Sequence, residues 1–559
     1  MNKQLTVAEY VIERLAALGI THAFGVPGDY AFPFDDAIEA SPHMKWTGSS
    51  NELNAGYAAD GYARIRGAAV LSTTYGVGEL SALNAVMGSK AERLPVFHLV
   101  GAPSTRLQHD RLVTHHSLGD GAFGSFRALS EAAACAGTSL TPDNVTGEME
   151  RVIRAALINN QPAYITVPAD FALMPVTGEP PAWRTLDEMK YMVSNDAELE
   201  AAVKAVLARL ADAKAPVVLA ACTVARYRLQ DRLAAFLEKS RIGYATAPMD
   251  KATLSEKHPN FLGMYSGAGS APHVRAAVEE ADCVIDVGGV VMSDINTGMW
   301  SHRINPARLV HLLPDRVKVG EKLYGPVSLA DMLTRLAAAV PAFTPAASPA
   351  GIPLLPMTGA PGDRITSAAL YPRLQRFLSE GDIVFAETGS CVLTMGAMGL
   401  PDRAVYHNQT LWGSIGWATP AAFGASLAAP DRRTVLVTGD GSHQLTANEI
   451  GTMGRYGAKP VIIVLNNGLF GVEEVINRTV GHAYDDLALW SYHKLPEAMG
   501  CTGWYSARVE TVGQFEEALA KAAAHDNASY IEVVLGADDL PAQFPAAVID
   551  QLYRMDTPK

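Results

Sequence analysis

The residues from Thr434 to Asn467 have the types and the spacing of a metal and phosphate site. Residues 434–438 predict a buried strand, Gly439-Asp440-Gly441-Ser442 interrupts it, residues 444–456 have helical periodicity, and residues 460–465 predict a second strand. In a right-handed βαβ unit the carboxyl ends of both strands lie at one edge of the sheet, so Asp440 and Asn467 can converge. Their oxygens suit Mg²⁺, and the glycines let backbone amides approach an anion at the helix start. A plain strand–turn–helix with a Gly-Asp-Gly turn is the alternative interpretation.

Carboxyl and imidazole groups elsewhere in the chain could carry acid–base chemistry. Glu52 opens a predicted helix, Asp29 follows Gly28, and His115 and His116 are adjacent. Each has a plain structural explanation when taken alone: an exposed glutamate in a first helical turn, an aspartate in a Gly-Asp turn, or a loop that happens to hold two histidines. Taken together, carboxyls and imidazoles are the groups that a proton relay requires.

Short β-branched runs alternate with Ala-rich helical patterns along almost the whole chain, which predicts α/β domains with parallel sheets. Residues 69–72 and 96–100 are expected as strands, and residues 53–64 and 82–93 as helices. Prolines cluster near 174–183 and again in 341–361, and such stretches suit linkers between domains. We therefore expect three domains, at about 1–175, 184–340 and 362–559.

Composition excludes several classes of function. The chain has 559 residues, 48% of them hydrophobic and 18% charged, with a formal net charge of −13. It has no dense Lys/Arg stripe, so nucleic acid is not an expected partner. The five cysteines lie far apart without a CxxC pair, which argues against structural zinc and against a disulfide framework. No apolar signal region and no run of 18 apolar residues is present, so we expect a cytoplasmic protein without a membrane partner.

Gly439-Asp440-Gly441-Ser442, followed some two dozen residues later by Asn466-Asn467, resembles the signature of thiamine-diphosphate enzymes. The resemblance implies a pyrimidine-binding domain, a middle Rossmann-like domain and a diphosphate-binding domain, in that order. It implies that Asp440, Asn467 and the carbonyl of Leu469 hold Mg²⁺ against the diphosphate, although decarboxylases of the family usually carry glycine at the last position. It also implies cofactor contacts at Thr388, Ser390, Gly441, Ser442 and His443.

Two further segments resemble the parts of this family that contact the aminopyrimidine ring. The helix that begins at Glu52 is similar to the family's pyrimidine-domain helix, whose leading glutamate protonates N1′. Trp412-Gly413-Ser414-Ile415-Gly416-Trp417 is similar to the turn beneath the cofactor. The resemblance implies that the Gly413 carbonyl accepts a hydrogen bond from the 4′-amino group. Ile415 would bend the cofactor into its V shape.

The loop 24–30 with Asp29, the loop 112–121 with His115-His116, and Glu473 after the paired asparagines resemble pyruvate and indolepyruvate decarboxylases. The resemblance implies non-oxidative decarboxylation of a 2-keto acid. It further implies that a thiamine-diphosphate ylid would add to the keto carbon, that CO₂ would leave, and that protonation of the enamine would release an aldehyde. The implied catalytic residues are Asp29, Glu52, His115, His116 and Glu473.

The same resemblance implies a homo-oligomer, at least a dimer and by expectation a tetramer, whose sites are shared between subunits. The substrate would face Thr388, Val392, Val472, Ile476 and Phe544. A valine at 392, where pyruvate-restricted relatives carry a bulky aromatic, favours aromatic or longer aliphatic keto acids. An acetolactate-synthase-like carboligase, a cofactor-binding protein without turnover, and a nucleotide-binding oxidoreductase that uses the Gly-Gly end of residues 284–289 are the alternatives.

Overall fold

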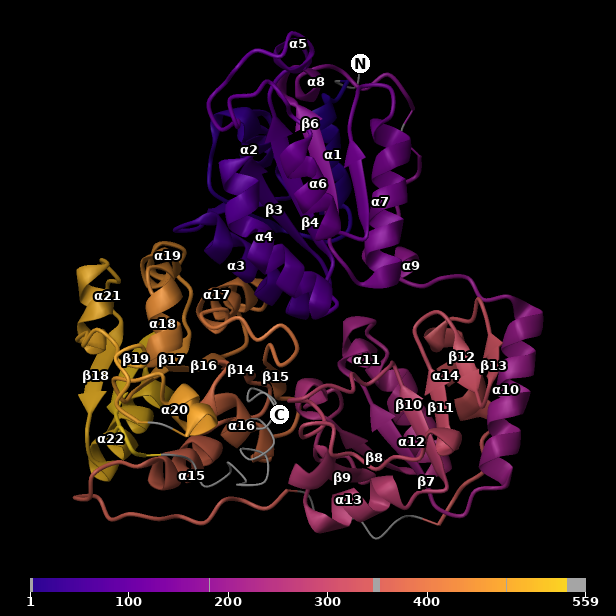
Figure 1. The fold of residues 1–559 in the computed structure, drawn as a ribbon, viewed down its shortest axis with the longest axis vertical. Helices are drawn as coiled ribbons and strands as arrows, with labels where there is room; N and C mark the ends of the chain where they lie inside the picture. Colours follow the sequence, from indigo (N-terminus) through magenta and orange to yellow (C-terminus); the bar gives the residue numbers. More distant parts are fainter. Residues whose placement is uncertain (1–3, 180, 345–351, 479, 540–559) are drawn as a thin grey trace.

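Three α/β units, each built on its own sheet, make up the computed structural model, which describes residues 4–179, 181–344, 352–478 and 480–539 (Figure 1). The N-terminal unit lies above the other two in Figure 1, and the middle and C-terminal units lie side by side beneath it. Within the described residues, no helix is both long enough and apolar enough to cross a membrane. The expectation of three α/β sheets is confirmed.

The N-terminal unit has a parallel six-stranded sheet in the order β2-β1-β3-β4-β6-β5. Its central strands β3 and β4 are buried along their whole length, as expected for a parallel sheet that helices cover on both faces. The strands are β1 (His22–Gly25), β2 (Lys45–Gly48), β3 (Ala69–Thr74), β4 (Val96–Ala102), β5 (Ala136–Ser139) and β6 (Ala163–Pro168). The helices are α1 (Val7–Ala16), α2 (Phe32–Ala40), α3 (Glu52–Arg66), α4 (Val77–Ala91), α5 (Thr105–His109), α6 (Ser125–Ala132), α7 (Val145–Asn159) and α8 (Ala169–Ala172), with α9 (Leu186–Met189) following.

The middle unit has a seven-stranded sheet in the order β13-β12-β11-β10-β7-β8-β9. Five of its strands run parallel, and β12 and β13 add an antiparallel edge to β11, so this sheet is mixed. The strands are β7 (Pro216–Ala220), β8 (Gly243–Thr246), β9 (Phe261–Met264), β10 (Cys283–Val287), β11 (Leu309–Leu312), β12 (Val317–Val319) and β13 (Lys322–Tyr324). The helices are α10 (Asp196–Ala211), α11 (Cys222–Arg226), α12 (Gln230–Ser240), α13 (Pro272–Glu279) and α14 (Leu329–Ala339).

The C-terminal unit has a parallel six-stranded sheet in the order β15-β14-β16-β17-β19-β18. The strands are β14 (Ile383–Ala386), β15 (Val405–His407), β16 (Thr434–Gly439), β17 (Val461–Asn466), β18 (Tyr505–Val509) and β19 (Ser529–Val534). The helices are α15 (Ser367–Phe377), α16 (Ser390–Ala397), α17 (Ala418–Ala428), α18 (Asp440–Thr446), α19 (Glu449–Arg455), α20 (Gly471–Asn477), α21 (Leu495–Ala498) and α22 (Val512–Ala524).

The single helix expected over residues 444–456 is two helices in the structure. Helix α18 begins at Asp440, directly after β16, and α19 follows a break at Ala447 and Asn448. The Asn448 carbonyl at this break accepts a hydrogen bond from the Ser50 hydroxyl of the N-terminal unit. The break therefore coincides with a contact between two units, which a local sequence pattern cannot predict.

Helices α3 and α17 join the N-terminal and C-terminal units at very close range. A Cβ atom at Gly61 would lie 1.9 Å from the Ala421 carbonyl oxygen, and one at Gly424 would lie 1.8 Å from the Ala58 carbonyl oxygen. Only glycine permits this approach of two helix backbones. The contact also makes one hydrophobic core continuous across both units, with Tyr62 of α3 and Phe423 of α17 among its buried residues.

Candidate active site

The carboxyl ends of β14, β16 and β17 form the floor of one pocket. These strands are parallel neighbours, so the segments that follow them meet at one edge of the sheet, as expected for ligand sites in open α/β sheets. Most of the residues expected to hold a cofactor or metal line this pocket: Thr388, Ser390, Asp440, Gly441, Ser442, Asn467 and Leu469. Of the expected substrate residues, Val472 also lines it.

Asp440 is the buried carboxylate of the pocket. Its Oδ2 accepts a hydrogen bond from the Gly468 amide at 2.7 Å and its Oδ1 accepts one from the Gly441 amide at 2.9 Å. Burial raises the pKa of Asp440 to about 6. A carboxylate, the amide oxygen of Asn467 and a free carbonyl are hard oxygen donors, and the start of α18 offers amides to an anion. The donor set therefore fits Mg²⁺ and a diphosphate.

Leu469 departs from the usual glycine, and the local backbone explains why a side chain is tolerated. The left-handed position of this turn falls on Gly468, with φ +74°, whereas Leu469 is not among the residues with positive φ. Leu469 also forms an isolated antiparallel bridge with Asp486, and the Leu469 amide donates to Asn467 Oδ1 at 3.3 Å. The left-handed conformation, which disfavours a side chain, is therefore adopted by Gly468, one residue before Leu469.

The turn that contains Gly413 and Ile415 is held by contacts from two directions. Gly413 has φ +66°, and its amide donates to the Gln409 carbonyl at 2.8 Å. The next residue, Ser414, has its hydroxyl 2.6 Å from the Tyr57 hydroxyl of α3 in the N-terminal unit. Ile415 is half-buried.

A buried carboxylate that sequence reasoning missed, Glu387, ties this turn to the pocket. Its two oxygens accept hydrogen bonds from the Thr388 amide at 2.9 Å and from the Ala418 amide at 3.0 Å. Burial raises the pKa of Glu387 to about 7. The sequence feature that could have indicated Glu387 is its position directly after the strand 383–386. Asp440 has the same position after β16.

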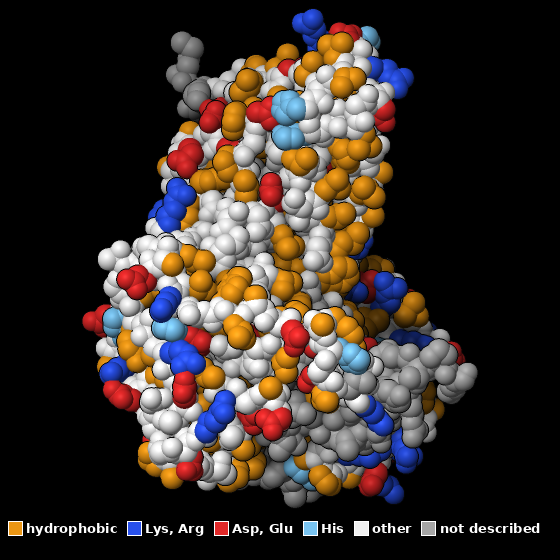
Figure 2. Space-filling model, turned by 60° about the vertical axis from the view of Figure 1, so that its left-hand side comes forward, with side chains coloured by type: hydrophobic (Ala, Val, Ile, Leu, Met, Phe, Trp, Pro, Cys, Tyr) orange, Lys and Arg blue, Asp and Glu red, His pale blue; other side chains and the backbone are white. Residues whose placement is uncertain are grey.

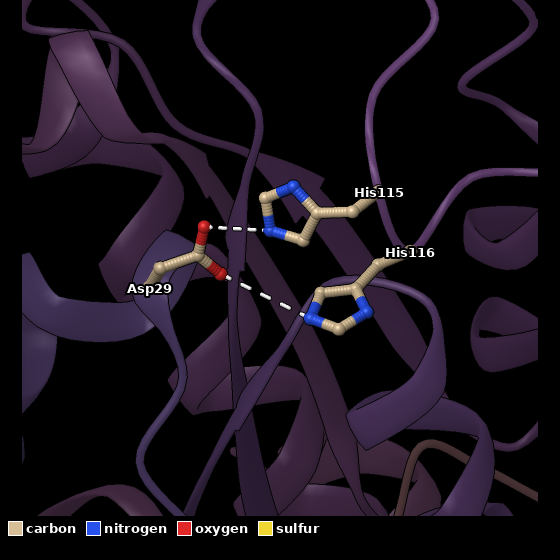
Figure 3. Close-up of side chains that lie close together, drawn as sticks. All are labelled: Asp29, His115 and His116. Carbon is tan, nitrogen blue, oxygen red and sulfur yellow. Dashed lines mark hydrogen bonds and ion pairs between the residues drawn. The ribbon is translucent and has the colours of Figure 1, made fainter.

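A second cluster lies in the N-terminal unit (Figure 3). The His115 Nε2 atom is 2.8 Å from Asp29 Oδ2, and the His116 Nε2 atom is 4.0 Å from Asp29 Oδ1. Asp29 follows β1, and the two histidines come from the loop between α5 and α6. The His115 ring stacks on Tyr30 with centroids 5.0 Å apart, and His116 adopts a left-handed φ of +61°. The loop is thus shaped so that both imidazoles reach one carboxylate.

Glu52 is the first residue of α3, and Asn51 caps that helix by accepting from the Asn54 amide. The Glu52 side chain is half-buried and lies against Gly78, where an added Cβ would be 3.3 Å from Glu52 Oε1. Glu52 and the Asp29 cluster thus belong to one unit, whereas the pocket belongs to another. Among the described residues, every one that lines the pocket comes from positions 367–539.

Six expected residues of the C-terminal unit are described but do not line the pocket: Gly413, Ile415, His443, Val392, Ile476 and Glu473. The His443 ring is buried between the hydroxyls of Thr419 and Tyr530, each within 2.9 Å of a ring nitrogen, so its side chain does not face the pocket. Val392 and Ile476 are half-buried, and Glu473 is exposed on α20. Phe544 lies outside the described residues.

Hydrophobic side chains are exposed around the N-terminal cluster. Leu112, Val113 and Leu118, in the loop that carries the histidines, are 44%, 67% and 64% exposed. Figure 2 shows hydrophobic side chains gathered over one face of the N-terminal unit and its junction with the unit below. Exposed apolar surface of this kind marks interaction sites more often than free surface.

Three family models match the chain in order. They are described as the N-terminal TPP binding domain of thiamine pyrophosphate enzymes (residues 5–124), their central domain (203–339) and their C-terminal TPP binding domain (387–533). Alpha-keto-acid decarboxylase of Mycolicibacterium paratuberculosis is 40% identical over 541 residues, which cover 96% of this chain and 95% of that protein. Alpha-keto-acid decarboxylase of Mycobacterium leprae is 39% identical over 563 residues, covering 99% and 98%.

A solved structure has a similar fold. The thiamine diphosphate-dependent 4-hydroxybenzoylformate decarboxylase of Rhodococcus jostii RHA1 aligns with a TM-score of 0.75 at 22% sequence identity, covering 96% of this chain and 100% of that one. At this identity the likeness concerns the fold alone.

Proposed function

The chain belongs to the thiamine-diphosphate-dependent 2-keto acid decarboxylases, and we propose that it converts a bulky 2-keto acid, aromatic or longer aliphatic, into an aldehyde and CO₂ with Mg²⁺ as the metal. Membership of the family makes it a carboxy-lyase that uses thiamine diphosphate. The single observation that carries the proposal is the pocket at the ends of β14, β16 and β17, where Asp440, Asn467 and Leu469 converge.

In the pocket, Asp440, Asn467 and the Leu469 carbonyl would hold Mg²⁺, and Gly441 and Ser442 would present the start of α18 to the diphosphate. The amides of Gly441 and Gly468 hold the two carboxylate oxygens of the buried Asp440 in place, which would favour binding of the metal. Thr388 and Ser390 also line the pocket. Thiamine diphosphate, when bound, supplies the carbanion chemistry that decarboxylation requires.

The side chains decide where protons go. Glu52 would hold the proton at N1′ of the aminopyrimidine, while the Gly413 carbonyl accepts from the 4′-amino group and Ile415 sets the bend of the cofactor. Asp29 is hydrogen-bonded to His115 and lies 4.0 Å from His116, and the three side chains would form a relay that delivers a proton to the carbon that loses CO₂. Glu473 would act beside the departing carboxylate.

We infer that two chains share each site. The Asp29 cluster and Glu52 lie in a unit that contributes no described residue to the lining of the pocket. Exposed Leu112, Val113 and Leu118 beside the histidines provide apolar surface for a second subunit. The minimal assembly is therefore a homodimer that juxtaposes the N-terminal cluster of one chain with the pocket of the other, with a tetramer as the proposed final state.

The finer assignments belong to the same proposal. We place the domain boundaries at 1–175, 184–340 and 362–559, and the site of action in the cytoplasm. Substrate size would be set by Thr388, Val392, Val472 and Ile476, because small aliphatic side chains leave room for a large keto acid. A carboligase of the acetolactate-synthase type is disfavoured, since the acid–base cluster suits protonation of the carbon that loses CO₂.

The test is a panel of 2-keto acids from pyruvate through branched aliphatic acids to phenylpyruvate and indolepyruvate. CO₂ release and aldehyde formation are measured with thiamine diphosphate and Mg²⁺, and the acids are ranked by kcat/KM. The proposal expects phenylpyruvate or indolepyruvate to rank above pyruvate. A ranking led by pyruvate would remove the substrate assignment, and acetohydroxy acids in place of aldehydes would favour the carboligase.

A further inference from the structure

The cluster of Asp29, His115 and His116 has a property that its role in proton transfer does not use. Among the described residues, it is the one group of three His, Cys, Asp or Glu side chains whose donor atoms all lie within 4.8 Å of one another. The Nε2 atoms of both imidazoles face the Asp29 carboxylate (Figure 3). Two imidazoles and one carboxylate, open to solvent, are a ligand set that transition metals bind.

The distances within the cluster are close to those of a zinc centre. His115 Nε2 lies 2.8 Å from Asp29 Oδ2, and His116 Nε2 lies 4.0 Å from Asp29 Oδ1. Tetrahedral zinc with ligand bonds of about 2.0–2.2 Å separates its ligand atoms by roughly 3.3–3.6 Å. One separation is shorter than this range and the other is longer. Small rotations of these solvent-accessible side chains therefore bring the three donor atoms onto one ion.

The surrounding structure holds both imidazole rings in this orientation. The buried Tyr30 ring stacks on His115 with an interplanar angle of 15°. The rings of His115 and His116 meet edge to face with centroids 4.6 Å apart, and His116 has a left-handed φ of +61°. Ligands that neighbouring groups already orient lose less freedom when a metal binds, so this arrangement favours a metal site.

Other histidine–carboxylate pairs of the chain provide two donors rather than three. His311 Nδ1 lies 2.8 Å from Asp286, and His109 Nδ1 lies 3.0 Å from Asp110. Within the part of the chain that the structure describes, no third His, Cys, Asp or Glu completes such a group around either pair. Three donors on one ion bind it more tightly than two, so we expect zinc to prefer the cluster.

The cluster and the pocket at Asp440 differ in the metals that they suit. The pocket offers oxygen donors, which suit Mg²⁺, whereas the cluster offers two imidazole nitrogens, which suit zinc. Excess Mg²⁺ should therefore fill the pocket and leave the cluster open to a zinc ion.

We propose that Asp29, His115 and His116 form a Zn²⁺ site and that the bound ion reversibly inhibits the enzyme. Zinc takes a lone pair from each Nε2 atom, any proton on these nitrogens is released to solvent, and neither nitrogen can then transfer a proton. A fourth position stays open to water, as in other sites with three protein ligands. The binding stands on the geometry of the cluster, whereas the inhibition rests on the proposed function.

The test uses the enzyme saturated with thiamine diphosphate and excess Mg²⁺, with the free Zn²⁺ concentration set by a chelating buffer. Equilibrium dialysis followed by elemental analysis counts the bound zinc without any keto acid present. The expected result is one Zn²⁺ per chain that further Mg²⁺ does not displace. CO₂ release from phenylpyruvate, measured directly at the same free Zn²⁺ concentrations, should fall with the same midpoint and recover when a zinc-selective chelator is added.

His115→Ala removes one ligand and should weaken Zn²⁺ binding by at least about 10-fold, because even the loss of an outer-shell partner costs that much. Its matched control is His109→Ala, which removes an exposed imidazole at the end of α5, just before the same loop. This control should leave zinc binding and CO₂ release unchanged. Asp29→Asn keeps the shape of the side chain without its charge and provides a second ligand variant, which should also bind zinc more weakly.

Three results would overturn the site: no saturable zinc binding under excess Mg²⁺, undiminished binding in His115→Ala, or an equal loss of binding in His109→Ala. Zinc that Mg²⁺ displaces would belong to the pocket at Asp440 and would overturn the site as well. Full CO₂ release from enzyme with a zinc-filled cluster would overturn the inhibition. If no keto acid is decarboxylated at all, the proposed function fails, while dialysis still decides whether the cluster binds zinc.

Discussion

The C-terminal pocket and the N-terminal cluster are built in opposite ways. The pocket rests on the ends of three adjacent strands of one sheet, its key carboxylate Asp440 is 2% exposed, and its contacts are to backbone amides. In the N-terminal cluster, Asp29 and His115 are exposed and His116 is half-buried on a long loop. Binding a cofactor calls for fixed ligands in a rigid frame, whereas proton transfer to a substrate calls for groups that a second surface can cover.

The largest effect is expected from removing the buried carboxylate of the pocket. Asp440→Ala should abolish both turnover and the rise in Tm that thiamine diphosphate and Mg²⁺ produce, because the metal loses its buried carboxylate and cofactor stabilisation depends on binding to the folded state. Thermal unfolding with and without cofactor measures this. The control is Asp486→Ala, which removes an exposed carboxylate from the residue that bridges Leu469, and it should keep the rise. A rise that survives Asp440→Ala would remove the metal role.

The next effect separates proton handling from cofactor binding. Glu52→Gln should lower kcat by about 10²–10⁴-fold while the cofactor-dependent rise in Tm remains, since loss of an acid–base partner affects chemistry more than binding. Steady-state kinetics and thermal unfolding on the same preparation provide the measurement. Activity within twofold of the unmodified enzyme would refute the role of Glu52.

A mixing experiment tests the proposal that the pocket of one chain meets the N-terminal cluster of another. Inactive Glu52→Gln and inactive Asp440→Ala chains, exchanged into mixed dimers, should regain activity at the one site that carries both intact residues. Subunit exchange is verified independently by differently tagged chains. Demonstrated exchange without any recovered activity would mean that each site is formed within one chain.

The two regions also differ in what the sequence could reveal. The pocket was predictable because Asp440 and Asn467 follow neighbouring parallel strands, and strand ends in such a sheet share an edge. The partners of Asp29 required the family resemblance, since 86 positions separate it from His115 and no local period connects them. Glu387 was not predicted as a site residue, because an isolated glutamate belongs to no recognisable sequence pattern. Its importance comes from burial between Thr388 and Ala418, which only the fold creates.

The finer expectations show the same difference between local patterns and contacts that only the fold creates. The strands expected at 69–72 and 96–100 and the helix expected at 53–64 are present, because β-branched runs and Ala-rich helical patterns are local properties of the sequence. The break at Asn448 accompanies a contact with Ser50 from another unit. The orientation of His443 depends on two hydroxyls distant in sequence, so its inclusion among the cofactor contacts could not be checked locally.

A smaller effect concerns substrate size. Val392→Trp should lower kcat/KM for phenylpyruvate relative to pyruvate by roughly 5- to 150-fold, because overpacking a formed site costs about 1–3 kcal/mol. Val472→Trp is the matched comparison, since Val472 lines the pocket whereas Val392 is half-buried and does not line it. Kinetics with both substrates decide the matter. Equal losses for the two substrates in Val392→Trp would show that this residue does not face the substrate.

The smallest expected effect tests the pH dependence of a buried carboxyl in each region. Glu387 in the C-terminal unit and Asp35 in the N-terminal unit both have pKa values raised by burial to about 7. A raised folded-state pKa means that the native chain binds more protons than the unfolded chain between about pH 4.5 and 7. Their contribution to stability is therefore present below about pH 4.5 and is lost as the pH rises through 7, by at most about 1.4 kcal/mol per pH unit for each group.

Glu387→Gln and Asp35→Asn should each flatten this decline, which urea unfolding at pH 5, 6, 7 and 8 measures as a difference from the unmodified chain. Only Glu387→Gln should also weaken thiamine diphosphate binding, because its carboxylate accepts the amides of Thr388 and Ala418, which flank the pocket and the turn at Gly413. The Asp35 carboxylate accepts from Ser72 inside the N-terminal core and touches neither segment. Equal cofactor affinity in the two variants would show that Glu387 has no role beyond the core. Weaker cofactor binding in Asp35→Asn would mean that the two regions are coupled through the fold.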